Sequence, residues 1–172
     1  MDITQLILDD HAEQRRLFAI IEQIDPTDVD ALTKVWGRLS AFLDVHAEAE
    51  ERFFYPELMK VGKSANDAEG TDAGPETEDA IEDHNKLRDA VKAVEKYPVG
   101  TGAWIEAVGK ANVVNSKHMG EEERQGLTDF RRHAPLQTRH DLAVKFAAFE
   151  AGHINGVKPV NKDPEAYVEQ HG

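Results

Sequence analysis

The chain has 172 residues, of which 40% are hydrophobic and 31% are charged, so it can bury one core and stay soluble. Its net charge of −13 disfavours nucleic acid and anionic membrane surfaces as partners. The absence of cysteine excludes disulfides, thiolate zinc sites and iron–sulfur clusters.

The sequence shows no signal for export or for membrane insertion. Its first ten residues, MDITQLILDD, lack both the basic region and the long apolar region of a secretory signal. No run in the sequence approaches the roughly 18 to 20 apolar residues that a membrane span needs. We therefore expect a cytoplasmic protein.

The first two predicted helices each turn polar at one level of an otherwise apolar face. The first runs from about residue 3 to 24, and His11 interrupts its stripe. The second runs from about residue 29 to 55, and its inner face reaches His46 and Glu50. The apolar positions are Ile3, Leu6, Ile7, Phe18, Ile21 and Ile24 in the first helix, and Leu32, Val35, Trp36, Leu39, Phe42 and Leu43 in the second.

The third and fourth predicted helices repeat this arrangement. The third runs from about residue 76 to 97, with His84 on its apolar face. The fourth runs from about residue 103 to 132, and its apolar face continues into His118 and Glu122. The order along the chain is therefore His, His-x3-Glu, His, His-x3-Glu.

The spacing of these elements predicts an all-α protein with one domain, residues 1–172. Its core is an up-down-up-down four-helix bundle over about residues 1–132. A break rich in glycine and small polar residues, 59–75, separates the two halves of the bundle. We expect a short fifth helix over about residues 136–151 and a loose tail over 152–172.

The positions of the turns bring the four histidines to one depth. In an antiparallel helical hairpin, two residues lie at the same depth when the turn falls midway between them. The sequence midpoints between consecutive histidines of the pattern each fall beside or inside a predicted connection. These connections are residues 26–28, 59–75 and 98–102. Hydrophobic patterning alone does not require this coincidence.

The local spacing of the ligand types points to metal. Residues four apart stand one above the other on a helix, about 6 Å along its axis, so His46 can act with Glu50 and His118 with Glu122. A single inward histidine is usually a satisfied core residue. Uncompensated burial of six ionisable groups at one level would be costly, however. Imidazoles and carboxylates together suit two first-row metal ions with open positions.

The remaining acids and histidines near the pattern are given lesser roles. We expect the two aspartates that precede His11 and His84 to face solvent. Four glutamates beside the motif are expected to be solvated or to contact the ligands from outside. The other histidines are treated as surface or packing residues. The two aspartates are Asp10 and Asp83, and the four glutamates are Glu48, Glu51, Glu121 and Glu123. The other histidines are His133, His140, His153 and His171.

Four segments, DDHAEQRRL, FLDVHAEAEERFFYPEL, EDHNKLRDAV and SKHMGEEERQGL, resemble the His-His-Glu cation-binding domains of the hemerythrin family over about residues 1–130. The resemblance implies a non-haem centre of two iron ions, joined by an oxo or hydroxo bridge, inside a four-helix bundle. Ferritin-like proteins are a poorer match because they use Glu-x-x-His. The ligands carried over are His11, His46, Glu50, His84, His118 and Glu122.

The sequence departs from the oxygen-carrying hemerythrins on the third helix. Those proteins place two histidines one turn apart there, whereas the positions four residues from His84 are Ala80 and Arg88. The site is therefore one imidazole short, and water or a phenolate could complete it. Tyr55 is the nearest candidate. On an ideal helix it would point away from Glu50, so a ligand and an interfacial aromatic residue both stay open.

The resemblance also implies a function. The chain is similar to bacterial hemerythrin-like proteins associated with oxidative and nitrosative stress. We expect a centre that reacts with hydrogen peroxide, nitric oxide or dioxygen, and an oxidoreductase if the chain is an enzyme. The alternatives are a reversible oxygen carrier, an oxygen or iron sensor module, and a bundle in which the metal is only structural.

Overall fold

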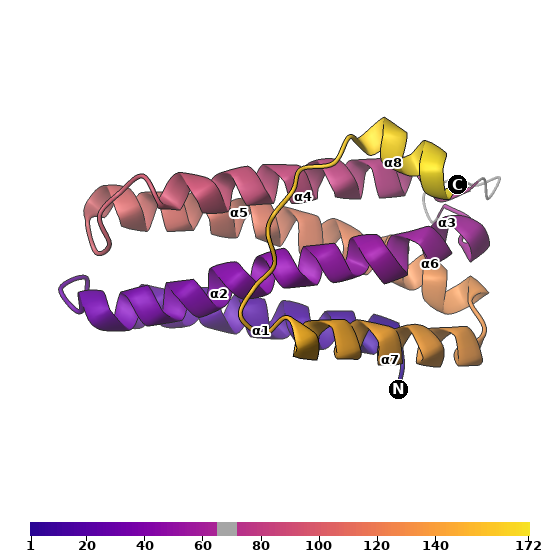
Figure 1. Cartoon of the computed structure of the whole chain (residues 1–172), viewed down its shortest axis with the longest axis horizontal. Helices are drawn as coiled ribbons and strands as arrows, with labels where there is room; N and C mark the ends of the chain where they lie inside the picture. Colours follow the sequence, from indigo (N-terminus) through magenta and orange to yellow (C-terminus); the bar gives the residue numbers. More distant parts are fainter. Residues whose placement is uncertain (65–71) are drawn as a thin grey trace.

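The computed structural model describes residues 1–64 and 72–172 (Figure 1). Helices and their connections make up this described part, which contains no strand. The α1–α2 and α4–α5 connections lie at one end of the bundle, and α3 lies at the other (Figure 1). This arrangement confirms the predicted all-α bundle. Its four long helices are α1 (Ile3–Gln23), α2 (Val29–Ala49), α4 (Gly74–Val94) and α5 (Gly102–Arg124).

Polar side chains cap the starts of three of these helices. The carboxylate of Asp2 accepts a hydrogen bond from the backbone of Thr4 at the start of α1, at 3.0 Å. Asp28 accepts one from the backbone of Ala31 at the start of α2, also at 3.0 Å. Thr101 does the same at the start of α5. Such caps satisfy N–H groups that have no partner inside the helix, which fixes where each helix begins.

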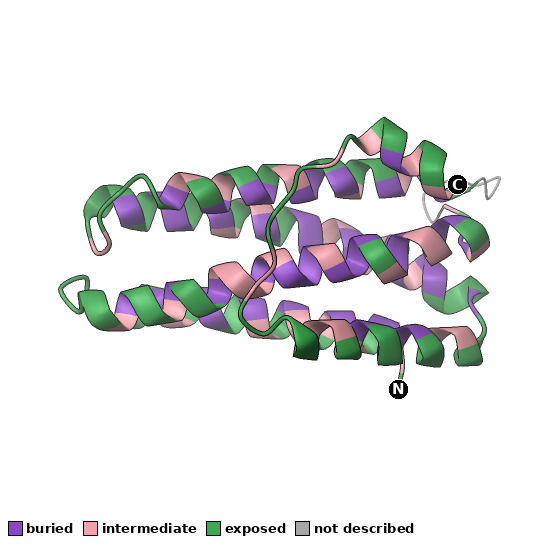
Figure 2. Cartoon of the chain, viewed as in Figure 1, coloured by how far each residue is buried: buried purple, intermediate pink, exposed green. Residues whose placement is uncertain are grey.

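Two apolar clusters fill the bundle, one on each side of the polar level. The cluster beside the α1–α2 and α4–α5 connections contains Leu17 and Trp104. The other contains Ile7, Phe54 and Phe130. Buried residues form the inward faces of the long helices (Figure 2). His11 lies between Ile7 and Leu17 in the sequence of α1, so the polar level separates the two apolar clusters.

The second helix does not end at residue 55 as the sequence predicted. A π-helical turn, η1 (Glu50–Phe54), follows α2, and the chain continues as α3 (Tyr55–Val61). The backbone N–H of Tyr55 bonds the carbonyl of Glu50, five residues earlier. Residues 59–61, which were expected to lie in the break, are therefore helical. The part of that predicted loop over 65–71 lies outside the described residues.

The predicted fourth helix is divided. It breaks at Gln125, whose φ of −109° and ψ of −89° are not helical, and the chain resumes as α6 (Gly126–His133). A Cβ atom added at Gly126 would lie 3.3 Å from the side chain of Leu58, so glycine permits the close approach of α6 to α3. The fifth helix is confirmed as α7 (Leu136–Gly152).

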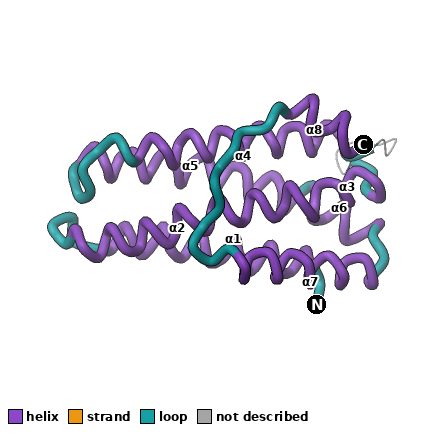
Figure 3. The backbone as a smooth tube through the Cα atoms, in the orientation of Figure 1, coloured by secondary structure: helices purple, strands orange, loops and turns teal. Residues whose placement is uncertain are grey.

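The expectation of a loose tail is wrong for its last part. After α7 the chain crosses the outside of the bundle and forms α8 (Pro164–His171), as Figure 3 shows. The carboxylate of Asp163 caps this helix. Tyr167 is buried and belongs to the same apolar cluster as Phe146 of α7. None of the helices in the described ranges combines the length and apolar character that a membrane span requires.

Candidate metal centre

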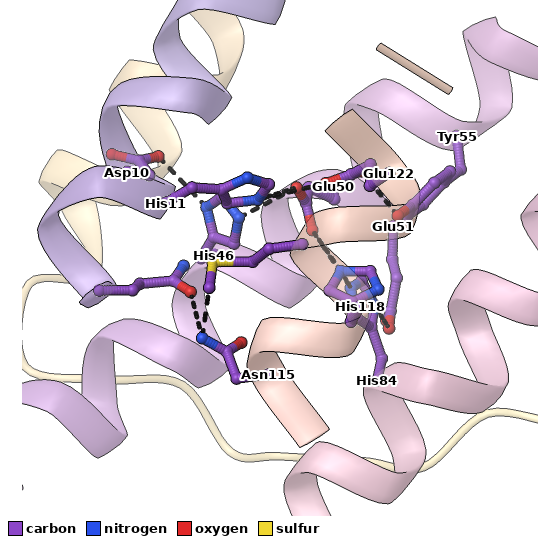
Figure 4. Close-up of polar contacts among 12 residues, drawn as sticks. Asp10, His11, His46, Glu50, Glu51, Tyr55, His84, Asn115, His118 and Glu122 are labelled. Carbon is purple, nitrogen blue, oxygen red and sulfur yellow. Dashed lines mark hydrogen bonds and ion pairs between the residues drawn. The ribbon is translucent and has the colours of Figure 1, made fainter. Parts of the chain in front are cut away.

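The six residues predicted from the motif meet at one level inside the bundle (Figure 4). His11 comes from α1, His46 from α2, and Glu50 from the first position of the π turn. The third long helix contributes a histidine and the fourth a histidine with a glutamate. All six side chains are buried: His11, His46, Glu50, His84, His118 and Glu122.

Glu50 lies at the centre of the cluster and faces two pairs of histidines. Its Oε1 lies 3.0 Å from His46 Nε2 and 4.0 Å from His11 Nε2. Its Oε2 lies 3.2 Å from His84 Nε2 and 4.0 Å from His118 Nε2. Two groups suited to a metal ion, His11 with His46 and His84 with His118, therefore share one carboxylate.

Glu122 completes the cluster and brings Tyr55 to it. Its Oε2 lies 3.2 Å from His11 Nε2, and its Oε1 accepts a hydrogen bond from the Tyr55 hydroxyl at 2.7 Å. The π turn explains why Tyr55 is there, because a wider turn brings a residue five positions after Glu50 onto the same helix face. The expectation that Tyr55 would point away holds only for an ideal α-helix. Burial and the charge of Glu122 raise the pKa of Tyr55 well above its ordinary value.

Three acids each contact the outer ring nitrogen of a histidine of the cluster. In each case the Nδ1 atom contacts a carboxylate, which leaves Nε2 directed towards the centre of the cluster. A carboxylate on one ring nitrogen fixes both the orientation and the tautomer of an imidazole. The pairs are His11 with Glu123 at 2.9 Å, His46 with Asp10 at 3.2 Å, and His84 with Glu51 at 2.8 Å.

Sequence reasoning assigned Asp10 to solvent and missed its role at His46. Asp10, Glu51 and Glu123 share one feature, because each is adjacent in sequence to a residue of the cluster but reaches a histidine on another helix. That adjacency was the available signal. Asp83, which was also assigned to solvent, is 4% exposed. It pairs with Lys117 at 2.9 Å and with a second lysine on α4.

The electrostatics of the cluster separate its groups into opposite protonation states. Burial would lower the pKa of His46, yet the Glu50 carboxylate raises it well above its ordinary value. Burial likewise lowers the pKa of His84, but the neighbouring carboxylates of Glu50 and Glu51 raise it to about 9. Burial, reinforced by the charge of His84, lowers the pKa of His118 to about 3.

Within the described part of the chain, several buried polar atoms of the cluster lack hydrogen-bond partners, as expected for a site that could hold a metal ion. Buried polar groups in proteins nearly always have hydrogen-bond partners. Here, among residues 1–64 and 72–172, several inward atoms have none, although each of the imidazole nitrogens concerned lies within 4.0 Å of a carboxylate oxygen. Imidazole nitrogens and carboxylate oxygens in this proximity are a donor set for first-row metals. The atoms are Nε2 of His11, Nε2 of His46, both carboxylate oxygens of Glu50 and Oε2 of Glu122.

The helix α7 adds one further acid that sequence reasoning missed. Glu150 of α7 lies with Asp10 beside His46, in a third group of possible ligands. Burial and the charge of Asp10 raise the pKa of Glu150 to about 8. The four other histidines lie outside these groups, as expected; His140, for example, contacts the N-terminal amine at 3.3 Å.

A four-helix bundle with a buried set of four histidines and two glutamates defines a metal-binding class of helical proteins. Residues 2–128 match the family described as hemerythrin HHE cation binding domain, and the chain belongs to this family. Neither a curated protein nor a solved structure matches the chain. Cation binding therefore follows from the family, and the histidine and glutamate groups could hold a metal ion.

Proposed function

We propose that the chain is a non-haem di-iron protein that reacts with small oxidants or diatomic molecules, in protection against oxidative or nitrosative stress. The molecules we consider are hydrogen peroxide, nitric oxide and dioxygen. One observation carries the proposal: a cavity reaches the cluster at Ala80 of α4, where the oxygen-carrying hemerythrins have a second histidine. The argument for each part follows from the side chains around that cavity.

The six predicted residues are the proposed ligands. His11 and His46 would hold one ion, His84 and His118 the other, and Glu50 would contact both. Two irons bound here would supply the electron transfer that no side chain of the cluster provides. The protein fixes the geometry: carboxylates hold three of the imidazoles from outside, and the apolar clusters on either side limit access of water.

The cavity supports a small reactant. It has a volume of about 210 Å³, and Tyr55, Ala80, His118 and Glu122 are among its lining residues. Pockets for drug-sized ligands occupy roughly 300–1,000 Å³, so this one suits molecules of a few atoms. Ala80 lies one turn before His84, where an imidazole would fill part of this space.

The rim of the cavity disfavours anions. Acidic side chains from α4 and α5 outnumber the two lysines, Lys86 and Lys117, among its lining residues. Lys117 is itself neutralised, because it pairs with Asp83 at 2.9 Å and with Glu121 at 3.0 Å. A rim with net negative charge repels anionic substrates and leaves uncharged peroxide and diatomic molecules unaffected.

The function is tested by mixing the iron-loaded protein with each candidate. The oxidised protein is mixed separately with hydrogen peroxide and with nitric oxide, and the reduced protein with dioxygen. We expect consumption of peroxide or nitric oxide, followed with an electrode, and no stable uptake of dioxygen. Reversible uptake of dioxygen, released under vacuum and without consumption of the other two, would instead establish an oxygen carrier.

Tyr55 is proposed as a further ligand, and its variant Tyr55→Phe tests this role. Its hydroxyl lies 2.7 Å from Glu122 Oε1, so it is within reach of an ion held by that carboxylate. If the phenolate binds ferric iron, the loaded protein shows a visible charge-transfer band that Tyr55→Phe removes. A spectrum unchanged by the substitution would assign Tyr55 to the hydrogen bond with Glu122 alone.

A further inference from the structure

A buried carboxylate outside the proposed ligand set links the C-terminal segment to the centre. Glu51 is 2% exposed. Its Oε1 accepts hydrogen bonds from His84 Nδ1 and from the guanidinium of Arg88, each at 2.8 Å. Its Oε2 pairs with the ammonium of Lys162. The Lys162 charge therefore compensates the half of the carboxylate that faces away from the histidine.

Lys162 is held in place by the residue next to His84. The side-chain amide of Asn85 donates to the Lys162 carbonyl at 2.6 Å and accepts from the Lys162 N–H at 3.0 Å. The ammonium also pairs with Glu48 at 3.0 Å. These contacts fix both the backbone and the side chain of Lys162 against α2 and α4, so its position does not depend on the Glu51 pair alone.

A side chain of α8 contacts the backbone of Glu51. In the π turn the carbonyl of Glu51 would accept from the N–H of residue 56, but Pro56 has none. The hydroxyl of Tyr167 donates to this carbonyl instead. A buried carbonyl without a donor is costly, so the proline in the π turn favours docking of α8. The C-terminal segment therefore contacts Glu51 at two points, through Lys162 at the carboxylate and through Tyr167 at the backbone carbonyl.

We propose that Lys162 is a positioning residue for the metal centre, acting through Glu51 on the ring of His84. This inference rests on the proposed centre. Lys162 and Arg88 together balance the charge of a buried carboxylate, which keeps its Oε1 on His84 Nδ1 and directs His84 Nε2 to Glu50. Without the ammonium, Glu51 keeps one cation and can rotate towards Arg88, away from the imidazole. Lys162 lies beyond the family match, which ends at residue 128.

The test measures metal affinity rather than activity. The full-length apo protein is titrated with Co²⁺ in competition with a chelator, and binding is followed by the visible ligand-field bands. We expect Lys162→Met to weaken Co²⁺ binding about tenfold, the lower end of what loss of an outer contact does to metal sites, and to shift these bands. Lys162→Arg should restore both. Lys158→Met, which changes an exposed lysine of the same segment, should match the wild type.

Two further variants separate the possible failures. Tyr167→Phe removes the hydroxyl that docks α8 but keeps the ammonium, so it should lower the melting temperature while the Co²⁺ bands stay unchanged. Wild-type affinity in Lys162→Met would overturn the positioning role. Equal weakening in Lys162→Met, Lys162→Arg and Tyr167→Phe would also overturn it, because tail docking alone would then explain the loss. Wild-type affinity in His46→Ala would refute the proposed centre itself, and the inference with it.

Discussion

Replacing His46 or His118 with alanine should remove most of the iron from the isolated protein. We expect the wild type to contain about two irons per chain, the number held by di-iron bundles. His46 belongs to one group of ligands around Glu50 and His118 to the other, so the two variants probe both proposed ions. Each substitution removes one imidazole from its group. Iron analysis and the near-ultraviolet charge-transfer bands measure the loss.

The control for this prediction is His140→Ala. His140 lies on α7 and contacts the N-terminal amine, away from the cluster. The iron content of the His140→Ala variant should therefore equal that of the wild type. Equal iron content in all three variants would show that other residues bind the metal. One zinc and no iron in the wild type would contradict the di-iron proposal. Metal-depleted wild type should also melt at a lower temperature, because an ion that binds only the folded state stabilises it.

The bundle and its polar level could be predicted from the sequence because both follow from local spacing. Helix periodicity places His11, His46, His84 and His118 on apolar faces, and the turn positions set their depth. The structure brings all four together with Glu50 and Glu122. Local spacing could not predict which carboxylate oxygen of Glu50 faces which histidine ring. The shared position of Glu50 depends on how the four helices are rotated about their axes, and packing of distant residues determines that rotation.

The features that sequence reasoning missed depend on contacts between distant segments. The π turn adds one residue to the helix at Glu50, and no propensity of the segment EERFF requires this. It brings Tyr55 to Glu122 on α5. The same turn and Pro56 leave the Glu51 carbonyl for Tyr167, which explains why the tail is docked rather than loose. The contacts of Tyr55 with Glu122 and of Glu51 with Tyr167 join residues 67 and 116 positions apart, which helix periodicity cannot predict.

Introducing a histidine at the missing position should suppress the reaction with peroxide. Ala80 lines the cavity with His118 and Glu122 and lies four residues before His84 on the same face of α4. An imidazole in Ala80→His would occupy the cavity and offer a further ligand where we propose that the reactant enters. We expect the rate of peroxide consumption by the iron-loaded protein to fall at least about tenfold, equivalent to about 1.4 kcal/mol in the barrier.

Two comparison variants decide why the rate falls. Ala80→Leu fills the same space without a ligand atom, so it should slow the reaction but leave the spectrum of the iron centre nearly unchanged. Ala80→His should change the spectrum as well, because an imidazole is added to the donor set. Ala148→His places the same side chain on the exposed face of α7 and should alter neither property. Undiminished peroxide consumption in both Ala80 variants would mean that the reactant reaches the centre by a route other than this cavity.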